Sequence, residues 1–166
     1  MDDFKEDLFD GPDRANPDRI WEAMMRVRGG SAARPAFILH WIEEVGAGAA
    51  FWPIVTRAWS GFDRIPHDEF AEWFHIFRRW RPKVEGLPRR MKVYRGQDAS
   101  APLGLSWTRK RKVAEEFARG HRLYFNPNPV VHELVITPGK VAFVCNDREE
   151  EEVVLRAAIQ YRDFGY

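Results

Sequence analysis

The chain has 166 residues, 45% of them hydrophobic and 14% aromatic, so it can bury a substantial apolar core and is predicted to form one compact unit. Its formal net charge of +1 is close to zero, so the overall charge does not indicate any class of binding partner. A lone cysteine, Cys145, excludes a disulfide framework within one chain and favours a reducing compartment. We therefore expect a cytoplasmic protein, with delivery into another cell as the alternative. No apolar run reaches the roughly 18 residues of a membrane span, so no membrane partner is expected.

The first half of the chain carries helical patterns, and residues 1–86 are predicted to form a helical N-terminal region. Asn16 can cap a helix that begins at Pro17 and stops at Gly29. Further helices are expected over 35–45, 49–60 and 66–80, and Pro53 should start or kink the second of these. Large aromatic residues recur at helical spacing and are expected in the core: Phe37, Trp41, Phe70, Trp73, Phe74, Phe77 and Trp80.

Beyond Pro82 the apolar runs become short and are separated by turn residues, as in strands. Residues 87–166 are therefore predicted to form a β-rich core, which makes the fold α+β. The expected strands cover residues 91–95, 104–108, 130–136, 140–145 and 151–157, with a further one near 159–165. One helix is expected between them, over 109–119.

A strand that ends on Arg95-Gly96 is the first of three informative motifs. The arginine can present a planar, permanently charged fork to a phosphate or carboxylate, and Gly96 lets a ligand or a backbone approach closely. The alternative is an arginine in a surface salt bridge.

The second motif is a strand with two hydroxyl residues that leads into the predicted helix. Because side chains alternate along a strand, Ser106 and Thr108 should line one face while Trp107 points to the other. Capping of the helix is the alternative role for Thr108.

The third motif is a run of glutamates, 149–152, followed at once by a β-branched strand. If this strand begins near Glu150, then Glu150 and Glu152 share one face about 7 Å apart, and their repulsion would raise the apparent pKa of one of them. Two such carboxylates are suited to acid/base work or to stabilising a developing positive charge. The alternative is a solvated acidic loop.

In this order and spacing, the three motifs resemble the arginine–serine–glutamate branch of the ADP-ribosyltransferases, which includes many bacterial toxins. The resemblance covers about residues 91–158. It implies a split β-sandwich core preceded by the helical region, with NAD+ as the substrate.

The resemblance also implies a role for each motif residue. Arg95 would hold the NAD+ phosphates, and the backbone of Gly96 would lie close to the nicotinamide amide. Ser106 would support the nicotinamide ribose pocket and fix the catalytic glutamate. Glu152 would bind the ribose 2′-hydroxyl and stabilise the cationic ribose as nicotinamide leaves.

Two further positions complete the implied site. Thr108 would occupy the second hydroxyl position of the serine motif. Glu150 would orient or deprotonate an acceptor, and glutamate at this position is associated with arginine acceptors.

Tyr124 and Phe125, in an irregular segment that could form a lid, are candidates to stack on nicotinamide, with core packing as the alternative. The loop before the glutamates, residues 146–149, has no aromatic ring, which leaves open whether the acceptor is a protein, a nucleic acid or water. Two activities therefore remain as hypotheses: transfer of ADP-ribose to a macromolecule, and hydrolysis of NAD+ with water as the acceptor. An inhibitor protein is a further candidate partner. The five histidines show no metal-ligand spacing, so no metal is expected.

A third hypothesis is a nucleic-acid-binding module without catalysis. It rests on a basic stretch that could contact phosphates, with a tryptophan inside it for stacking. A solvated basic surface is the alternative reading of this stretch. Its members are Arg78, Arg79, Trp80, Arg81, Lys83, Arg89, Arg90 and Lys92, and residues 109–112 add a second basic cluster.

Overall fold

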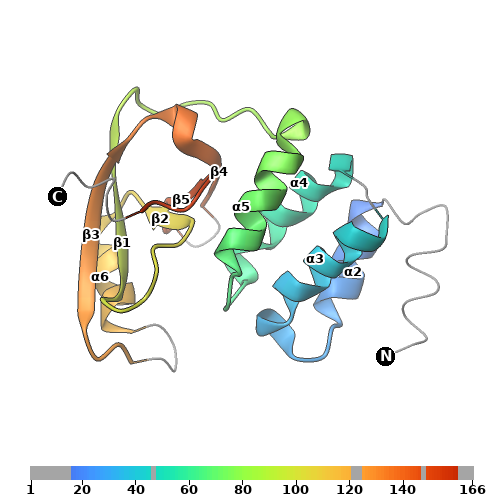
Figure 1. Cartoon of the computed structure of the whole chain (residues 1–166), viewed down its shortest axis with the longest axis horizontal. Coiled ribbons are helices and arrows are strands. Elements are labelled where there is room, and N and C mark those ends of the chain that lie inside the picture. The colour runs from blue at the N-terminus through green and yellow to red at the C-terminus, as the bar shows by residue number, and fades with distance from the viewer. Residues whose placement is uncertain (1–15, 46–47, 121–124, 147–148, 161–166) are drawn as a thin grey trace. The chain divides into compact units, whose positions relative to one another are not determined.

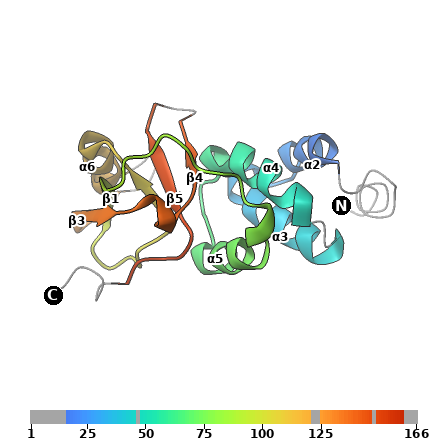
Figure 2. The ribbon, with the colours of Figure 1, turned by 90° about the horizontal axis from the view of Figure 1, so that it is seen from above.

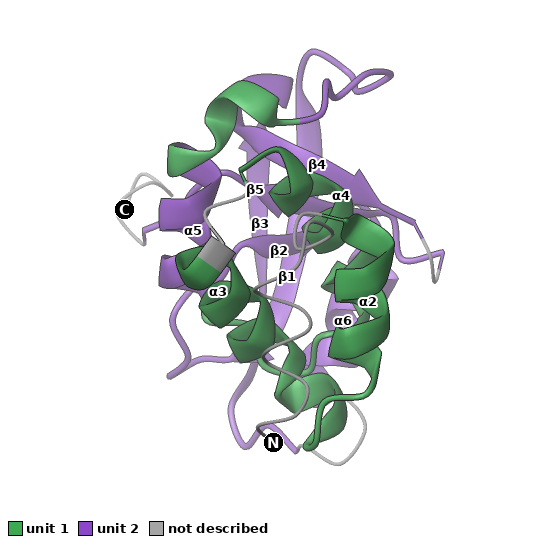
Figure 3. Ribbon diagram, turned by 90° about the vertical axis from the view of Figure 1, so that its right-hand side faces the viewer, with its two compact units in different colours: residues 1–66, 76–81 green, residues 67–75, 82–166 purple. Residues whose placement is uncertain are grey.

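The structure, a computed structural model, describes residues 16–45, 48–120, 125–146 and 149–160 (Figure 1). The chain divides into two compact units, coloured separately in Figure 3. Unit 1 comprises residues 1–66 and 76–81, and unit 2 comprises residues 67–75 and 82–166. The sequence placed all of residues 1–86 in the helical region, whereas helical residues 67–75 here belong to the unit that contains the sheet.

Unit 1 consists of α-helices joined by short 3-10 turns. The α-helices are α2 (Pro17–Met25), α3 (Arg34–Val45) and α4 (Gly48–Ala58). The turns are η1 (Gly30–Ala32), η2 (Trp59–Gly61) and η3 (Arg78–Trp80). The Asn16 cap is confirmed, since its Oδ1 accepts a hydrogen bond of 3.0 Å from the Asp18 backbone. Helix α2 ends at Met25, a few residues before the predicted stop at Gly29.

Helix α4 runs through its proline. Pro53 lies inside the helix and does not start it, because the helix already begins at Gly48. The aromatic side chains around α4 form the core of unit 1, where Trp41, Phe51 and Phe77 are buried. Trp52 is buried as well, and its indole N–H donates to the Phe77 carbonyl at 2.9 Å. The expectation of an aromatic core is confirmed here, although Trp80 is 37% exposed beneath the Arg79 guanidinium.

Unit 2 contains an antiparallel five-stranded sheet with the strand order β3-β1-β2-β5-β4, which confirms the α+β class. The strands are β1 (Met91–Asp98), β2 (Ser106–Thr108), β3 (Pro129–Ile136), β4 (Val141–Cys145) and β5 (Glu152–Leu155). Helix α5 (His67–Ile76) precedes the sheet, helix α6 (Arg111–Arg119) follows β2, and the 3-10 turn η4 (Pro138–Lys140) joins β3 to β4. Of the strand expected near 159–165, residues 159–160 are not in a strand and the rest lies outside the described residues.

The two faces of the sheet have different coverings. One face buries an apolar cluster that includes Val93, Trp107, Val153 and Leu155. On the other face, α6 packs against β1 and β3 (Figures 1 and 2). Phe74 of α5 meets the ring of Phe143 of β4 at a centroid distance of 6.0 Å. Arg95 lies on β1, Ser106 and Thr108 lie on β2, and Glu152 lies on β5, so these motif residues belong to the central strands.

Candidate functional site

The hydroxyl strand and the glutamate strand are direct neighbours. Ser106 pairs with Val154, Trp107 with Val153 and Thr108 with Glu152. Directly opposed residues of antiparallel strands point to the same face, so the side chains of Ser106, Thr108 and Glu152 share one face. Trp107 is buried on the other face, as the alternation of the strand predicts.

Arg95 reaches this strand pair from β1. Strands β1 and β2 share the pair Tyr94–Thr108, so alternation directs the Arg95 side chain away from the face of Thr108. Its guanidinium instead donates through Nη1 to the carbonyl oxygen of Ser106 at 2.6 Å and through Nε to Oε1 of Gln97 at 2.6 Å. Gln97 is buried and donates in turn to the Ala101 carbonyl at 2.7 Å. The structure therefore brings Arg95 to the backbone of Ser106, and Gln97 is a supporting residue that the motifs did not reveal.

The backbone of Gly96 lies close against the backbone of helix α6. A Cβ atom at this position would lie 1.7 Å from the carbonyl oxygen of Ala114 and 2.5 Å from the backbone nitrogen of Ala118, both in α6. The requirement for glycine is therefore explained by the packing of α6 on β1. The expected approach of its backbone to nicotinamide stays a prediction.

The glutamate run is a turn that precedes the strand. Strand β5 begins at Glu152, while Glu149 and Glu151 have φ angles of 57° and 46°, in the left-handed region. The interpretation that Glu150 and Glu152 alternate along one strand, about 7 Å apart on a shared face, is therefore wrong. Left-handed backbone at a residue other than glycine is energetically unfavourable and persists where surrounding contacts hold it.

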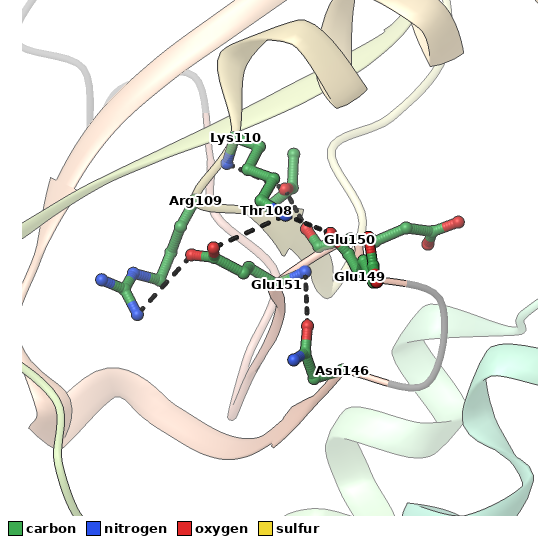
Figure 4. A network of polar contacts seen from close by, with 7 residues as sticks. All are labelled: Thr108, Arg109, Lys110, Asn146, Glu149, Glu150 and Glu151. Atoms are coloured by element: carbon green, nitrogen blue, oxygen red, sulfur yellow. Dashed lines mark hydrogen bonds and ion pairs between the residues drawn. The ribbon is translucent and has the colours of Figure 1, made fainter.

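Those contacts come from three consecutive residues, the last one of β2 and the two after it (Figure 4). The Lys110 ammonium donates to the carbonyl of Glu149, the Thr108 hydroxyl to that of Glu150, and the Arg109 backbone N–H to that of Glu151. Three successive carbonyls thus face segment 108–110, which regular strand alternation would not allow. We call residues 149–151 the glutamate turn.

Side chains close the glutamate turn from both sides. The Glu151 carboxylate lies 3.6 Å from the Lys110 ammonium and 3.8 Å from the Arg109 guanidinium. On the other side, Asn146 Oδ1 accepts a hydrogen bond of 3.2 Å from the Glu151 backbone N–H (Figure 4). The backbone that leads into Glu152 is therefore fixed over its last residues.

The Thr108 hydroxyl holds two backbone groups together. It donates to the Glu150 carbonyl and accepts a hydrogen bond of 3.0 Å from the Lys110 N–H, just before α6 begins. We expect Thr108→Val to lower the free energy of unfolding by about 2 kcal/mol, because it leaves both groups unsatisfied at a buried position. Urea denaturation measures this loss, with Thr108→Ser as the control that keeps the hydroxyl. Equal stability of the valine and serine variants would contradict this role.

His67, at the start of α5, is a residue near the motifs that they did not indicate. Its Nδ1 accepts a hydrogen bond of 3.1 Å from the Leu105 N–H, next to Ser106. Burial lowers the pKa of His67 to about 3, with a further contribution from the charge of Arg95. Burial, and after it the charge of Arg95, also lower the pKa of His132, which is the β3 residue paired with Arg95 of β1. Both histidines thus stay neutral more readily than a solvated histidine.

The low pKa of His67 makes stability depend on pH. Between pH 3 and 6.5 the unfolded chain binds a proton at His67 that the folded protein does not bind. Stability is therefore lost as pH falls below 6.5, by at most about 1.4 kcal/mol per pH unit from this group. Urea unfolding between pH 7 and pH 4 should show a shallower decline in His67→Asn, which cannot titrate there. Parallel declines in the two proteins would rule out this assignment.

Of the two candidate stacking residues, Phe125 is the one that the structure describes. Tyr124 lies outside the described residues, and Phe125 is 83% exposed, so it is not a core residue. The neighbouring Asn126 is anchored, since its amide donates to the carbonyls of Phe117 and Ala118 at the end of α6. The stacking role of Phe125 stays a prediction.

Within the described ranges, no group of three histidine, cysteine or acidic side chains is arranged to hold a metal ion. No helix in this part of the chain has the length and apolar character needed to cross a membrane. Comparison of the chain with family models, with curated proteins and with solved structures found no match. The functional interpretation therefore depends on the residues and their geometry.

Proposed function

We propose that the protein is an ADP-ribosyltransferase that cleaves NAD+ at the bond between nicotinamide and ribose. The observation that supports this best is the pairing of Thr108 with Glu152 on adjacent strands, beside a Ser106 whose carbonyl is bound by Arg95. Arg95, Ser106 and Glu152 lie on three neighbouring strands, although Glu152 comes about 45 residues after Ser106 in sequence. A split β-sandwich of the ADP-ribosyltransferase type is the fold proposed with it.

The chemistry requires negative charge next to a ribose that becomes cationic. Nicotinamide leaves NAD+ as a neutral molecule, and the ribose passes through an oxocarbenium-like state, which a preorganised carboxylate stabilises. Glu152 is the group proposed for this task, because the glutamate turn fixes the backbone that carries it. Ser106, on the same face, supports the ribose pocket.

Arg95 has a modified role in this proposal. Its guanidinium binds the Ser106 carbonyl, which holds β2 in place, and the side chain of Gln97, which orients the guanidinium from within β1. We therefore assign Arg95 to positioning β2, because its side chain points away from the face that carries Thr108 and Glu152. Charge-assisted hydrogen bonds of this kind each contribute roughly 1.5–3 kcal/mol.

NAD+ glycohydrolysis is the second candidate function. The described residues between β4 and β5 are Asn146 and the glutamate turn, and none of them carries an aromatic ring to meet a protein acceptor. The nucleic-acid hypothesis has less support, since the basic stretch is divided between the two units. Within it, Lys83 pairs with Glu85 at 2.8 Å and Lys92 with Glu133 at 2.6 Å.

The test is incubation of the purified protein with NAD+ labelled on the adenosine side, with and without a cell lysate. Nicotinamide release with label on a protein or nucleic acid supports the transferase. Nicotinamide release with free ADP-ribose as the sole labelled product supports the glycohydrolase. A folded protein that releases no nicotinamide under either condition overturns both.

A further inference from the structure

Strands β1 and β2 diverge beside Ser106. Their described pairing is Tyr94 with Thr108, the last residue of β2, whereas Ser106, at the start of β2, pairs with Val154 of β5. Backbone N–H and C=O groups at such a point still need partners, because an unpaired buried group is costly. The segment Leu105–Ser106 obtains them from side chains and from β5.

Three hydrogen bonds hold this segment. The Leu105 N–H donates to His67 Nδ1 at 3.1 Å, and the Ser106 carbonyl accepts from Arg95 Nη1 at 2.6 Å. The Leu105 carbonyl accepts from the Leu155 N–H of β5 at 2.9 Å. The segment is thus fixed from α5, from β1 and from β5 at the same time.

The chain makes room for the His67 ring. A Cβ atom at position 104 would lie 2.3 Å from His67 Nε2 and 2.6 Å from Cδ2, so only glycine leaves space for the ring there. Gly104 thus explains how an imidazole from α5 reaches the backbone of Leu105, directly before β2. The Leu105 bond requires an unprotonated Nδ1, and burial together with the charge of Arg95 lowers the pKa of His67 accordingly.

We propose that His67 is a positioning residue of the nicotinamide-cleaving site: with Arg95 it fixes Leu105 and Ser106, and through the β2–β5 ladder it sets the place of Glu152. This inference rests on the proposed function. It adds a residue of α5, outside the three motifs, to the set that determines activity. His67 acts through the backbone of β2 and has no assigned contact with substrate.

The experiment compares His67→Leu, which removes the acceptor, with His67→Asn, whose side-chain oxygen can replace Nδ1. We expect His67→Leu to lower kcat for nicotinamide release by about tenfold to a hundredfold with little change in KM, since small misplacements of reacting groups have effects of this size. His67→Asn should retain kcat within about threefold. His75→Leu, an exposed position on the same helix, is the matched control and should behave as the wild type.

Amide hydrogen exchange at Leu105 provides a readout independent of activity. In His67→Leu this amide should exchange at least about tenfold faster than in the wild type, while His67→Asn keeps it protected. Unchanged exchange in His67→Leu, or an equal loss of kcat in the leucine and asparagine variants, overturns the proposal. If the wild-type protein releases no nicotinamide while the Leu105 amide is protected from exchange, the proposed function is overturned. The hydrogen bond from the Leu105 amide to His67 would then have a structural role alone.

Discussion

Glu152→Gln should lower the rate of nicotinamide release from NAD+ by roughly two to three powers of ten, while the protein stays folded. Glutamine keeps the size of the side chain and an oxygen acceptor, and it removes the negative charge that would face the cationic ribose. A single preorganised electrostatic contact of this kind contributes about 3–4 kcal/mol to the transition state. Because the charge matters most when the ribose becomes cationic, the loss should appear in kcat more than in KM. Initial rates across NAD+ concentrations measure both.

The matched control is Glu149→Gln, a change of the same chemistry in the same turn. Glu149 contributes its backbone carbonyl to the Lys110 bond, and its side chain is exposed. We therefore expect its kcat to stay within about twofold of the wild type, as for other surface substitutions away from a site. Equal rates for the Glu152→Gln variant and the wild type would show that the carboxylate of Glu152 takes no part, and the proposed chemistry would have to be abandoned.

Local patterns were sufficient to predict most of the elements of unit 2. The strands β1, β3 and β4 lie where short β-branched runs end on turn residues, and the η4 turn contains Pro138 and Gly139. The α+β class follows from the same patterns. These predictions succeed because period-2 alternation and proline or glycine punctuation are properties of neighbouring residues.

The glutamate turn could not be predicted in this way. The sequence pattern predicts that the strand begins near Glu150, because the four glutamates directly precede the β-branched residues with no turn residue between them. What ends the strand at Glu152 is a set of hydrogen bonds from Thr108, Arg109 and Lys110, about 40 residues earlier in the chain. Tertiary contacts of this kind override local propensity, and no local pattern records them.

His67 was missed for a related reason. A single histidine near the start of a helix has no spacing that marks it, and its partner Leu105 is 38 residues away. The signal that could have indicated it is Gly104, a glycine two residues before β2, where another group must approach the backbone closely. Such a glycine shows that space is needed but does not say what fills it.

Gly96 illustrates the same ambiguity and leads to the largest expected loss of stability. From the sequence, either a ligand or another part of the backbone could lie against Gly96. In the structure, the backbone of helix α6 lies there. The Cβ of an alanine would meet the Ala114 carbonyl at 1.7 Å and the Ala118 nitrogen at 2.5 Å, and both atoms belong to the backbone of α6. A side chain could rotate away, but backbone cannot, so α6 would have to move off β1.

We therefore expect Gly96→Ala to lower the free energy of unfolding by about 3 kcal/mol or more, at the upper end of the range for overpacking. In a chain of this length that corresponds to a fall in Tm of roughly 6–12 °C, measurable by calorimetry. Gly139→Ala is the control, since its Cβ would meet nothing closer than Thr137 Oγ1 at 3.6 Å, and its Tm should change by less than about 2 °C. Because α6 starts directly after the residues that hold the glutamate turn, a displaced helix should also lower nicotinamide release. A Gly96→Ala protein with the same Tm as the wild type would contradict the close packing of α6 on β1.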